Sequence, residues 1–550
     1  MNYIKLFFLS LLLLAEACSN PQQEVDLIVH HAIVYTVNAD FAVAEAFAVK
    51  DGKIIEVGSS KALLAKYKSK QTLDAQGKAV YPGFEDAHCH FVGYGLALQQ
   101  VDLVGTKSYQ EILEKLVAFQ KANPNIRWLQ GRGWDQNDWD TKDFPDKAPL
   151  DSLFPDLPVY LTRVDGHAAL VNQKALDLAG INTKTPSDAG GKIEIKNGKL
   201  SGILVDNAMR LVSSKIPAPN AEEIKKALLD AQKNCFALGL TSVQDAGLPQ
   251  ETLEAIDQLH QSGDLYIRIY AMISSTPENV DYYLKKGISR TDFLSIRSFK
   301  VYADGALGSR GACLLEPYSD SPTEIGFLRA KPEELDALIQ KIAQKGFQVN
   351  THCIGDSANR FILDTYAKYL KKDNDLRWRI EHAQVVSPED IPKFGKYKIL
   401  PSVQPTHATS DMYWADERLG AKRISTAYAF RKLYEQNRMI PLGSDFPVEF
   451  VNPLYGFHAA VARKDGKNYP DAGFQKENAV SREIALKGMT IWAAYAAFEE
   501  KTRGSIEPGK WADFVILEED IMKVPEEKLR NVKVFQTYSG GMLKFNMTKQ

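Results

Sequence analysis

The chain has 550 residues, and its 67 Lys and Arg against 69 Asp and Glu give a formal net charge of −2 at pH 7. This balance disfavours a polybasic nucleic-acid binder. A content of 45% hydrophobic and 25% charged residues is that of an ordinary globular protein. The chain as a whole is therefore not a disordered, collagen-like or coiled-coil protein. A chain of this length can bury one large core or several smaller ones.

The start of the chain does not fit a globular fold. The apolar run Leu6–Leu14 is too short to span a bilayer and is typical of a signal peptide. Ala17 and Cys18 resemble the lipobox of bacterial lipoproteins, in which the signal is removed and the new N-terminal cysteine is lipidated. The alternative is an ordinary signal peptide cut after Ala17. We predict a signal peptide over residues 1–17 and a tether over residues 18–23.

Both alternatives predict an extracytoplasmic protein, located in the periplasm or at the cell surface. In the lipoprotein alternative the protein contacts the membrane only through its N-terminal lipid anchor.

From about Ser242 onward, short apolar runs rich in β-branched residues alternate with helical patterns, which is typical of βα units on a parallel sheet. Helix starts between the runs are well marked, as at Thr276-Pro277-Glu278, where an N-cap precedes a proline at the first helical position. Seven strands are predicted, over residues 241–246, 266–273, 299–303, 348–352, 378–382, 400–405 and 440–444.

An eighth strand is predicted far upstream, over residues 79–90, and eight parallel strands would close a (β/α)8 TIM-like barrel of the α/β class. About 150 residues separate this strand from the next, more than an ordinary βα connection needs. We therefore expect an inserted subdomain over residues 100–217. The barrel itself is expected over residues 79–99 and 218–503.

Both ends of the chain carry strand patterns outside the barrel. Apolar and polar residues alternate over residues 25–73, and strand-like runs recur at residues 514–517 and 532–538. We predict that residues 24–78 and 504–550 pair into one small composite β domain.

Four of the ten histidines lie at the carboxyl ends of predicted barrel strands, which is where barrel enzymes keep their active sites. A single buried histidine is more often a hydrogen-bonded core residue, but four at strand ends favour a metal site. Because one residue separates His88 from His90, both imidazoles point to the same face of an extended strand and can bind one cation. The four are His88, His90, His352 and His382.

Two further residues occupy unusual positions. Asp445 follows the last predicted strand, where a carboxylate can accept a proton from a metal-activated water; the alternative is a turn or N-cap aspartate. Lys300 stands between Phe299 and Val301 in the middle of a strand. Such a lysine either faces solvent or is buried with a partner, and solvent is scarce on a barrel strand covered by helices.

The strand-end motifs resemble, in the same order, those of the amidohydrolase superfamily, and the closest branch is amidohydrolase family 3, which includes N-substituted formamide deformylase-like enzymes. The resemblance runs from about Asp26 to the C-terminus. Glu85 departs from it, because the family more often has an apolar residue there; we do not expect Glu85 to contact metal. The motifs are PGFEDAHCH (82–90), GRGWD (131–135), RVDGH (163–167), KVYADG (300–305), THCIGD (351–356), RIEHAQ (379–384), LGSD (442–445) and GSIEPGKWAD (504–513).

The resemblance implies a binuclear site. Zinc is the ion expected for imidazole and carboxylate ligands, although iron, manganese and cobalt remain open. Carboxylation by CO₂ would convert the lysine from a repelled cation into an anionic oxygen ligand. The implied roles are His88 and His90 on the first metal, His352 and His382 on the second, Lys300 bridging both as a carbamate, and Asp445 completing the first metal and moving the proton.

A second group of residues falls near the pocket in the resembling family. Their alternative interpretation is structural packing, because loop position alone does not distinguish the two. The candidate substrate-binding residues are Trp134, Asp135, Arg163, Asp165 and His167 in the insertion, Asp304 and Arg310 after Lys300, and His407 after the seventh predicted barrel strand.

We therefore expect an exported, metal-dependent amidohydrolase that cleaves a non-peptide carbon–nitrogen bond in a small N-acyl, N-formyl or cyclic amide. The same metal site acting as an esterase or a deaminase is the nearest alternative. A non-catalytic, surface-tethered binding protein is the alternative of a different class. The expected partner is a small-molecule substrate and not a nucleic acid; whether the chain forms a homo-oligomer is left open. Specificity in this fold is set by the loops and the insertion, and their sequence does not identify the substrate.

Overall fold

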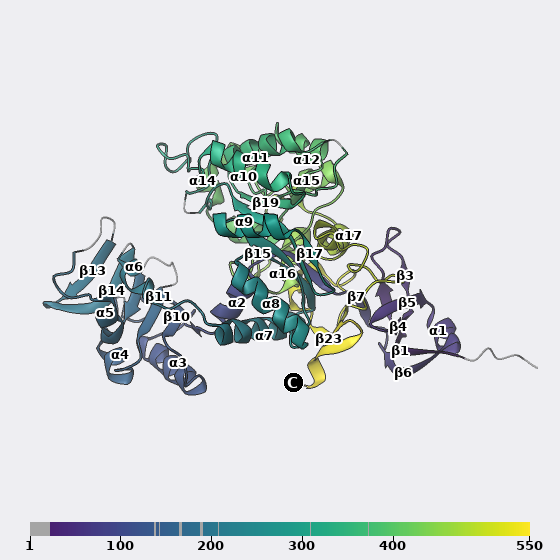
Figure 1. Cartoon of the computed structure of the whole chain (residues 1–550), viewed down its shortest axis with the longest axis horizontal. Helices are drawn as coiled ribbons and strands as arrows, with labels where there is room; N and C mark the ends of the chain where they lie inside the picture. Colours follow the sequence, from purple (N-terminus) through teal and green to yellow (C-terminus); the bar gives the residue numbers. More distant parts are fainter. Residues whose placement is uncertain are drawn as a thin grey trace, which may run out of the picture.

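The structure is a computed structural model that describes residues 22–136, 139–141, 143–163, 168–186, 191–206, 208–308, 310–371 and 373–549. Figure 1 shows a central parallel barrel with the inserted subdomain on one side and the terminal β domain on the other. The predicted signal peptide, and with it Cys18, lies outside the described residues. Among the described residues, no helix has the length and apolar character that a membrane crossing requires.

The barrel is built from parallel strands that follow one another around the sheet, which confirms the predicted fold class. Its strands in spatial order are β8 (Phe84–Cys89), β15 (Leu240–Leu248), β16 (Arg268–Ser274), β18 (Leu294–Tyr302), β19 (Gln348–Cys353), β20 (Arg379–His382) and β21 (Leu400–Ser402); β17 (Ser289–Arg290) pairs with β18 outside this order.

The eighth position is filled by the segment around Leu442, although it is not a regular strand. Leu442 bridges Val403 in the parallel sense, and its carbonyl accepts a hydrogen bond of 3.0 Å from the amide of Ala87 in β8. Gly443 donates to the carbonyl of Val403 at 3.0 Å. The chain therefore closes the barrel between β21 and β8, and this closure brings Asp445 beside His88 of β8 and His90, which follows it.

Helices surround the barrel, and the sequence marks their starts. Thr276 accepts a hydrogen bond from the amide of Asn279 at the start of α9, and Asn220 and Glu223 form a reciprocal cap on α7. The helices are α2 (Phe91–Ala97), α7 (Ala221–Ala237), α8 (Gln250–Ser262), α9 (Pro277–Lys286), α10 (Pro332–Ala343), α11 (Asp356–Tyr369), α12 (Ile391–Tyr397), α13 (Pro405–Asp411), α14 (Ala415–Ile424), α15 (Phe430–Asn437), α16 (Pro453–Ala462), α17 (Arg482–Gly488) and α18 (Ile491–Ala496).

The terminal β domain joins both ends of the chain in two sheets, with orders β5-β4-β1-β6 and β24-β23-β22-β7-β2-β3. Its shared core includes Leu27, Phe47 and Phe514. The elements are β1 (Gln23–His30), β2 (Ile33–Tyr35), β3 (Val43–Ala44), β4 (Ala46–Lys50), β5 (Lys53–Gly58), α1 (Ser60–Lys66), β6 (Tyr67–Asp74), β7 (Ala79–Pro82), β22 (Phe514–Leu517), β23 (Val534–Ser539) and β24 (Met542–Asn546).

The predicted strand over residues 79–90 is two strands. β7 pairs with β22 and β2 in the terminal domain, whereas β8 pairs with β15 in the barrel. The break falls at Gly83, where a Cβ atom would lie 2.2 Å from Oγ1 of Thr241, so only glycine fits without displacement. The sequence did not reveal this break, because β7 and β8 are both buried and their residues read as one strand.

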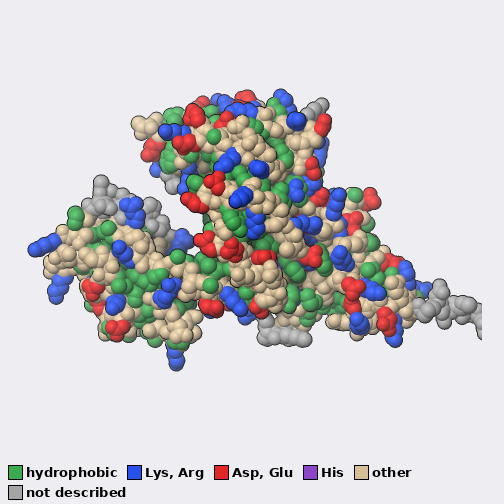
Figure 2. Space-filling view, viewed as in Figure 1, with side chains coloured by type: hydrophobic (Ala, Val, Ile, Leu, Met, Phe, Trp, Pro, Cys, Tyr) green, Lys and Arg blue, Asp and Glu red, His purple; other side chains and the backbone are tan. Residues whose placement is uncertain are grey.

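The inserted subdomain has its own six-stranded sheet, of order β13-β14-β12-β11-β10-β9, with apolar clusters centred on Leu129 and Leu204. Its elements are β9 (Val101–Asp102), α3 (Tyr109–Ala122), β10 (Leu129–Trp134), α4 (Ala148–Leu153), β11 (Val159–Arg163), β12 (Ala168–Val171), α5 (Gln173–Ala179), β13 (Gly191–Lys196), β14 (Lys199–Asp206) and α6 (Met209–Ser213). Acidic and basic side chains are interspersed over the face of the molecule in Figure 2, in line with the balanced charge.

Candidate metal centre

The predicted site residues of the barrel meet at the carboxyl ends of its strands. His88 lies in β8, His90 directly follows it, and Lys300 lies two residues before the end of β18. His352 is in β19 and His382 ends β20. Ring centroids lie 4.9 Å apart for His88 and His382, and 4.5 Å apart for His352 and His382.

His88 is fully buried and held at both ring nitrogens. Its Nδ1 lies 2.5 Å from Oε2 of Glu381, and its Nε2 lies 3.0 Å from Nζ of Lys300 and 3.5 Å from Oδ1 of Asp445. Burial, followed by the charge of Lys300, lowers the pKa of His88 to about 4. The imidazole is therefore neutral at pH 7, which is the form that binds metal.

His90 and His382 are oriented in the same way. Nδ1 of His90 lies 3.0 Å from the carbonyl oxygen of Ala246, and Nδ1 of His382 lies 2.7 Å from Oε1 of Gln404. Both contacts require Nδ1 to carry the proton in a neutral ring, which leaves the lone pair on Nε2. Such partners fix the tautomer of metal-ligating histidines in known sites.

His352 has a different setting. Its Nε2 lies 3.4 Å from the carbonyl oxygen of Gly305 and 3.8 Å from Oδ1 of Asp304. Burial, with the charge of Lys300 next, lowers the pKa of His352 to about 3. This ring is therefore also neutral, and it packs against His382.

Asp445 faces the histidines from a left-handed backbone position, with φ of 64°. Its amide donates to the carbonyl of His88 at 2.7 Å, and its Oδ1 lies 3.2 Å from Nε2 of His90. Burial would raise the pKa of Asp445, but the imidazoles of His90 and His88 outweigh burial and hold that pKa well below its usual value. The buried Oδ1 has no hydrogen bond of good geometry from the described residues.

These contacts fit a bound cation. In neutral rings the Nε2 atoms of His88 and His90 are acceptors, like the anionic Oδ1 of Asp445, so a positive charge is needed to hold them this close. Burial would lower the pKa of His90, but Asp445 outweighs burial and raises that pKa, so a proton on His90 or a bound metal ion can supply the charge. Ligand atoms of His88, His382 and Asp445 all lie within 4.8 Å of one another. Imidazole nitrogen and carboxylate oxygen are the donor set of zinc and related divalent ions.

Lys300 is buried among these groups and forms no ion pair with a carboxylate of the described residues. Burial lowers its pKa to about 8. Its Nζ also lies 5.0 Å from the ring centre of Tyr302.

The candidate substrate residues of the insertion divide into three groups. Trp134 is fully buried in the core of the inserted subdomain and donates to the carbonyl of Leu161 at 2.8 Å, which fits the packing interpretation. Arg163 pairs with Asp135 at 2.5 Å. Asp165 and His167 lie outside the described residues.

The remaining candidates follow barrel strands: Asp304 and Arg310 lie in the loop after β18, and His407 lies in α13 after β21. Asp304 accepts three backbone hydrogen bonds of 2.8–3.0 Å from the segments at Cys313 and Ile354, so its carboxylate is committed to holding these loops. Arg310 forms an ion pair of 2.8 Å with Asp320. His407 faces the centre, because its ring stacks on His382 with centroids 6.0 Å apart.

Three residues that contact or orient the candidate ligands were not among those predicted from the sequence: Glu381, Arg379 and Gln404. Nε of Arg379 lies 2.6 Å from Oε1 of Glu381, and both side chains are completely buried. Burial would raise the pKa of Glu381, but Arg379 and His88 outweigh it and lower that pKa to about 2. The sequence does hold a signal for this pair. Arg379 and Glu381 are separated by one residue in a buried strand, so their opposite charges lie on the same face and can pair.

A parallel barrel whose strand ends gather neutral imidazoles around a buried carboxylate is the arrangement of a metal-dependent hydrolase. The chain belongs to the amidohydrolase family, whose model matches residues 71–543. This membership confirms the family resemblance of the motifs. The protein is a hydrolase of the amidohydrolase family, a metal-dependent family that acts on small molecules.

Relatives match nearly the whole chain. YtcJ of Bacillus subtilis, whose name describes a candidate amidohydrolase, is 33% identical over 94% of this chain and 98% of its own. The N-substituted formamide deformylase of Arthrobacter pascens is 27% identical over 95% of this chain and 99% of its own. The crystal structure of a metal-dependent hydrolase from Pyrococcus horikoshii matches with a TM-score of 0.77 and 29% identity, over 91% of this chain and 99% of the other.

The hydrogen bond between His382 and Gln404 gives a first test of the centre. Gln404→Met keeps the side-chain length but removes the acceptor for the Nδ1 proton of His382. We expect the affinity for zinc to fall by about 10–100-fold, the usual effect of losing such a partner. Competition with a chromophoric chelator measures this affinity.

Gln404→Glu serves as the matched variant, because it retains an acceptor oxygen and should retain metal. Equal zinc affinity in the Met variant and the wild type would show that this contact does not orient a ligand.

Proposed function

We propose that the protein hydrolyses the carbon–nitrogen bond of a small N-acyl, N-formyl or cyclic amide with a metal-activated water. The observation that carries this proposal is the buried Oδ1 of Asp445, which lies 3.2 Å from Nε2 of His90 and 3.5 Å from Nε2 of His88, a set of atoms that one cation would satisfy together. A site arranged in this way favours a cation and a polarised substrate over a purely structural role.

We assign two zinc ions to the centre. The assignment rests on the donor set and on the neutral state of the His88 and His352 imidazoles. When bound, the metal supplies a Lewis acid for the scissile carbonyl and makes water a competent nucleophile near neutral pH. The proposed ligands are His88, His90 and Asp445 for the first ion, His352 and His382 for the second, and Lys300 for both.

Asp445 is the proposed proton carrier. It is a buried, ionised carboxylate beside His88 and His90, so it can accept the proton that water loses and return it to the leaving nitrogen. His407 lies on the other side of this carboxylate, with its Nε2 3.8 Å from Oδ2 of Asp445. We propose that His407 contacts substrate from this side, with Arg163, Asp135 and Arg310 as further candidates.

A carbamate on Lys300 is proposed for an electrostatic reason. An ammonium ion in this position would sit 3.0 Å from the imidazole of His88 and would repel a divalent cation. Attack of the neutral amine on CO₂ forms a nitrogen–carbon bond and releases one proton, which leaves an anionic oxygen donor. The lowered pKa of Lys300 makes the neutral amine more accessible than for an exposed lysine.

Two other functions remain as alternatives. The same centre acting on an ester or removing an amino group from a heterocycle would use the same residues. A surface-tethered binding protein would keep the barrel without turnover.

Asp445→Asn tests the proposed chemistry. Because asparagine tolerates a left-handed backbone, this change should leave the fold intact while removing the proton carrier. We expect kcat to fall by about 10²–10⁴-fold. The assay measures amine release from a panel of N-formyl, N-acyl and cyclic amides. Esters and aminated heterocycles are assayed separately as substrates of the alternative activities.

Asp51→Asn is the matched control, because Asp51 also has a positive φ, of 51°, but lies in a turn of the terminal domain. A metal-loaded wild type that releases no amine would favour the binding-protein alternative. Turnover of esters alone, or ammonia from heterocycles alone, would favour the alternative activities.

Lys300→Ala tests the carbamate. We expect this variant to lose bound metal and turnover, and short carboxylic acids to restore part of both by supplying the missing oxygen ligand. Metal-free wild type should recover activity with zinc only when bicarbonate is also present. Full recovery in CO₂-free buffer would instead support a neutral Lys300 acting as a base.

We also propose that the protein is exported and anchored through a lipid on Cys18. The support is the apolar run followed by small residues and a cysteine. Cys18→Ser should release the protein from membranes or leave the precursor uncut. Mass spectrometry of the mature N-terminus checks this, and a soluble wild type beginning at Ser19 or later would contradict it.

A further inference from the structure

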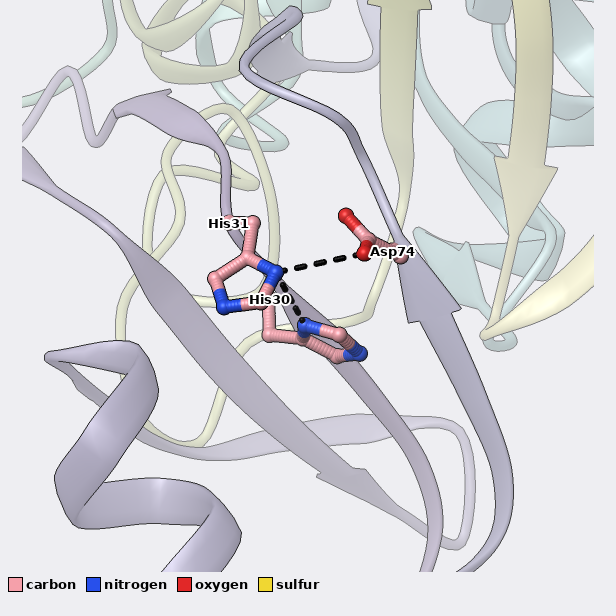
Figure 3. A group of neighbouring side chains, drawn as sticks. All are labelled: His30, His31 and Asp74. Atoms are coloured by element: carbon pink, nitrogen blue, oxygen red, sulfur yellow. Dashed lines mark hydrogen bonds and ion pairs between the residues drawn. The ribbon is translucent and has the colours of Figure 1, made fainter.

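A second group of metal-binding side chains lies in the terminal domain, outside the barrel. His30 is the last residue of β1, His31 follows it, and Asp74 is the last residue of β6. Figure 3 shows the three side chains turned toward one another, with both imidazoles and the carboxylate meeting at one edge of the sheet.

Two distances within this group match those between ligands of one metal ion. Nδ1 of His31 lies 3.2 Å from Nδ1 of His30 and 3.2 Å from Oδ2 of Asp74. Zinc binds nitrogen and oxygen at about 2.0–2.1 Å, and two ligands of a tetrahedral ion at that distance are about 3.3 Å apart. Two of the three separations therefore already match one bound ion, and all three ligand atoms lie within 4.8 Å of one another.

A single proton does not satisfy these contacts. If Nδ1 of His31 carries the proton, one N–H faces both the carboxylate of Asp74 and the lone pair of His30. If it does not, its own lone pair faces the carboxylate. One cation among the three atoms satisfies all of them at once.

The backbone holds both histidines in place. His30 is paired in parallel register with Asp74, and its carbonyl accepts a hydrogen bond of 2.9 Å from the amide of Ala75. The carbonyl of His31 accepts one of 2.7 Å from Gly77. The arrangement therefore does not depend on side-chain packing alone.

Two further contacts orient the ligand groups. The amide of His31 donates to Oγ of Ser60 at 2.8 Å, and the amide of Gln76 donates to Oδ1 of Asp74 at 2.8 Å. The second bond leaves Oδ2 free for the histidines. The Gln76 amide, followed by His31, holds the pKa of Asp74 below its usual value, so the carboxylate is ionised at neutral pH.

We propose that His30, His31 and Asp74 bind one divalent transition-metal ion of the zinc, copper and nickel class. Two imidazoles select these ions over magnesium and calcium, which prefer oxygen ligands. The side chains of His31 and Asp74 are 58% and 48% exposed, so water can complete the shell. The site is independent of the catalytic centre, and its metal ties the end of β1 to the end of β6.

Zinc stoichiometry tests the proposal in the full chain. Equilibrium dialysis with metal analysis should show one more zinc bound per wild-type chain than per chain of His31→Ala or Asp74→Asn. Asn retains the oxygen that accepts from Gln76 but loses the charge, so the turn should persist. Amide hydrolysis should be unchanged in both variants, because neither residue belongs to the barrel.

Asp40→Asn, which removes another exposed carboxylate of the terminal domain, is the matched control and should bind as much zinc as the wild type. Zinc should also raise the unfolding midpoint of wild type more than that of the two variants, because a ligand that binds only the folded state stabilises it. Equal stoichiometry in wild type and His31→Ala, or displacement of the additional zinc by magnesium, would overturn the proposal.

Discussion

The metal centre depends on a pair of opposite charges buried inside the barrel. Arg379 and Glu381 have no exposed surface, and removing one partner of such a pair typically costs about 3–5 kcal/mol because the other charge is left buried and unpaired. Glu381 in turn holds Nδ1 of His88. The orientation of His88 therefore depends on the Arg379–Glu381 ion pair, whose loss would strongly destabilise the fold.

The guanidinium of Arg379 extends this constraint around the barrel. It donates to the carbonyl of Ala87 in β8, to the side chain of Gln244 in β15 and, at 2.9 Å, to Oγ of Ser402 in β21. These strands lie on both sides of β20, and β8 and β21 flank the irregular eighth position. One side chain therefore fixes the spacing of the segments that carry His88 and Asp445.

The sequence predicted the barrel well because βα units repeat a local pattern. Strands after residue 240 appear near their expected positions, and their strand-end histidines converge as expected. The pattern failed where two buried strands abut at Gly83 and where hydrogen bonding around Leu442 is irregular. Both features depend on contacts with distant strands, which periodicity does not record.

The same limit applies to the site. The candidate ligands were recognisable from residue type and spacing, as for His88 and Lys300. Partners such as Gln404 were not recognisable. A glutamine near a strand end can form many different hydrogen bonds, and only the structure shows that its side-chain oxygen accepts from His382. Glu85 is a related case: it departs from the family pattern, and in the structure it pairs with Arg503 at 2.9 Å near the return to the terminal domain.

The direct passage from β7 into β8 couples two parts of the molecule mechanically. The strand that belongs to the terminal domain ends one residue before the strand that carries His88, with only Gly83 between them. Gly83 also donates to the carbonyl of Asp513, where the chain returns to the terminal domain, at 2.9 Å. A rotation of that domain would pull on β8 within a few residues of a candidate ligand. The position of the terminal domain is therefore linked to the position of His88 through the backbone around Gly83.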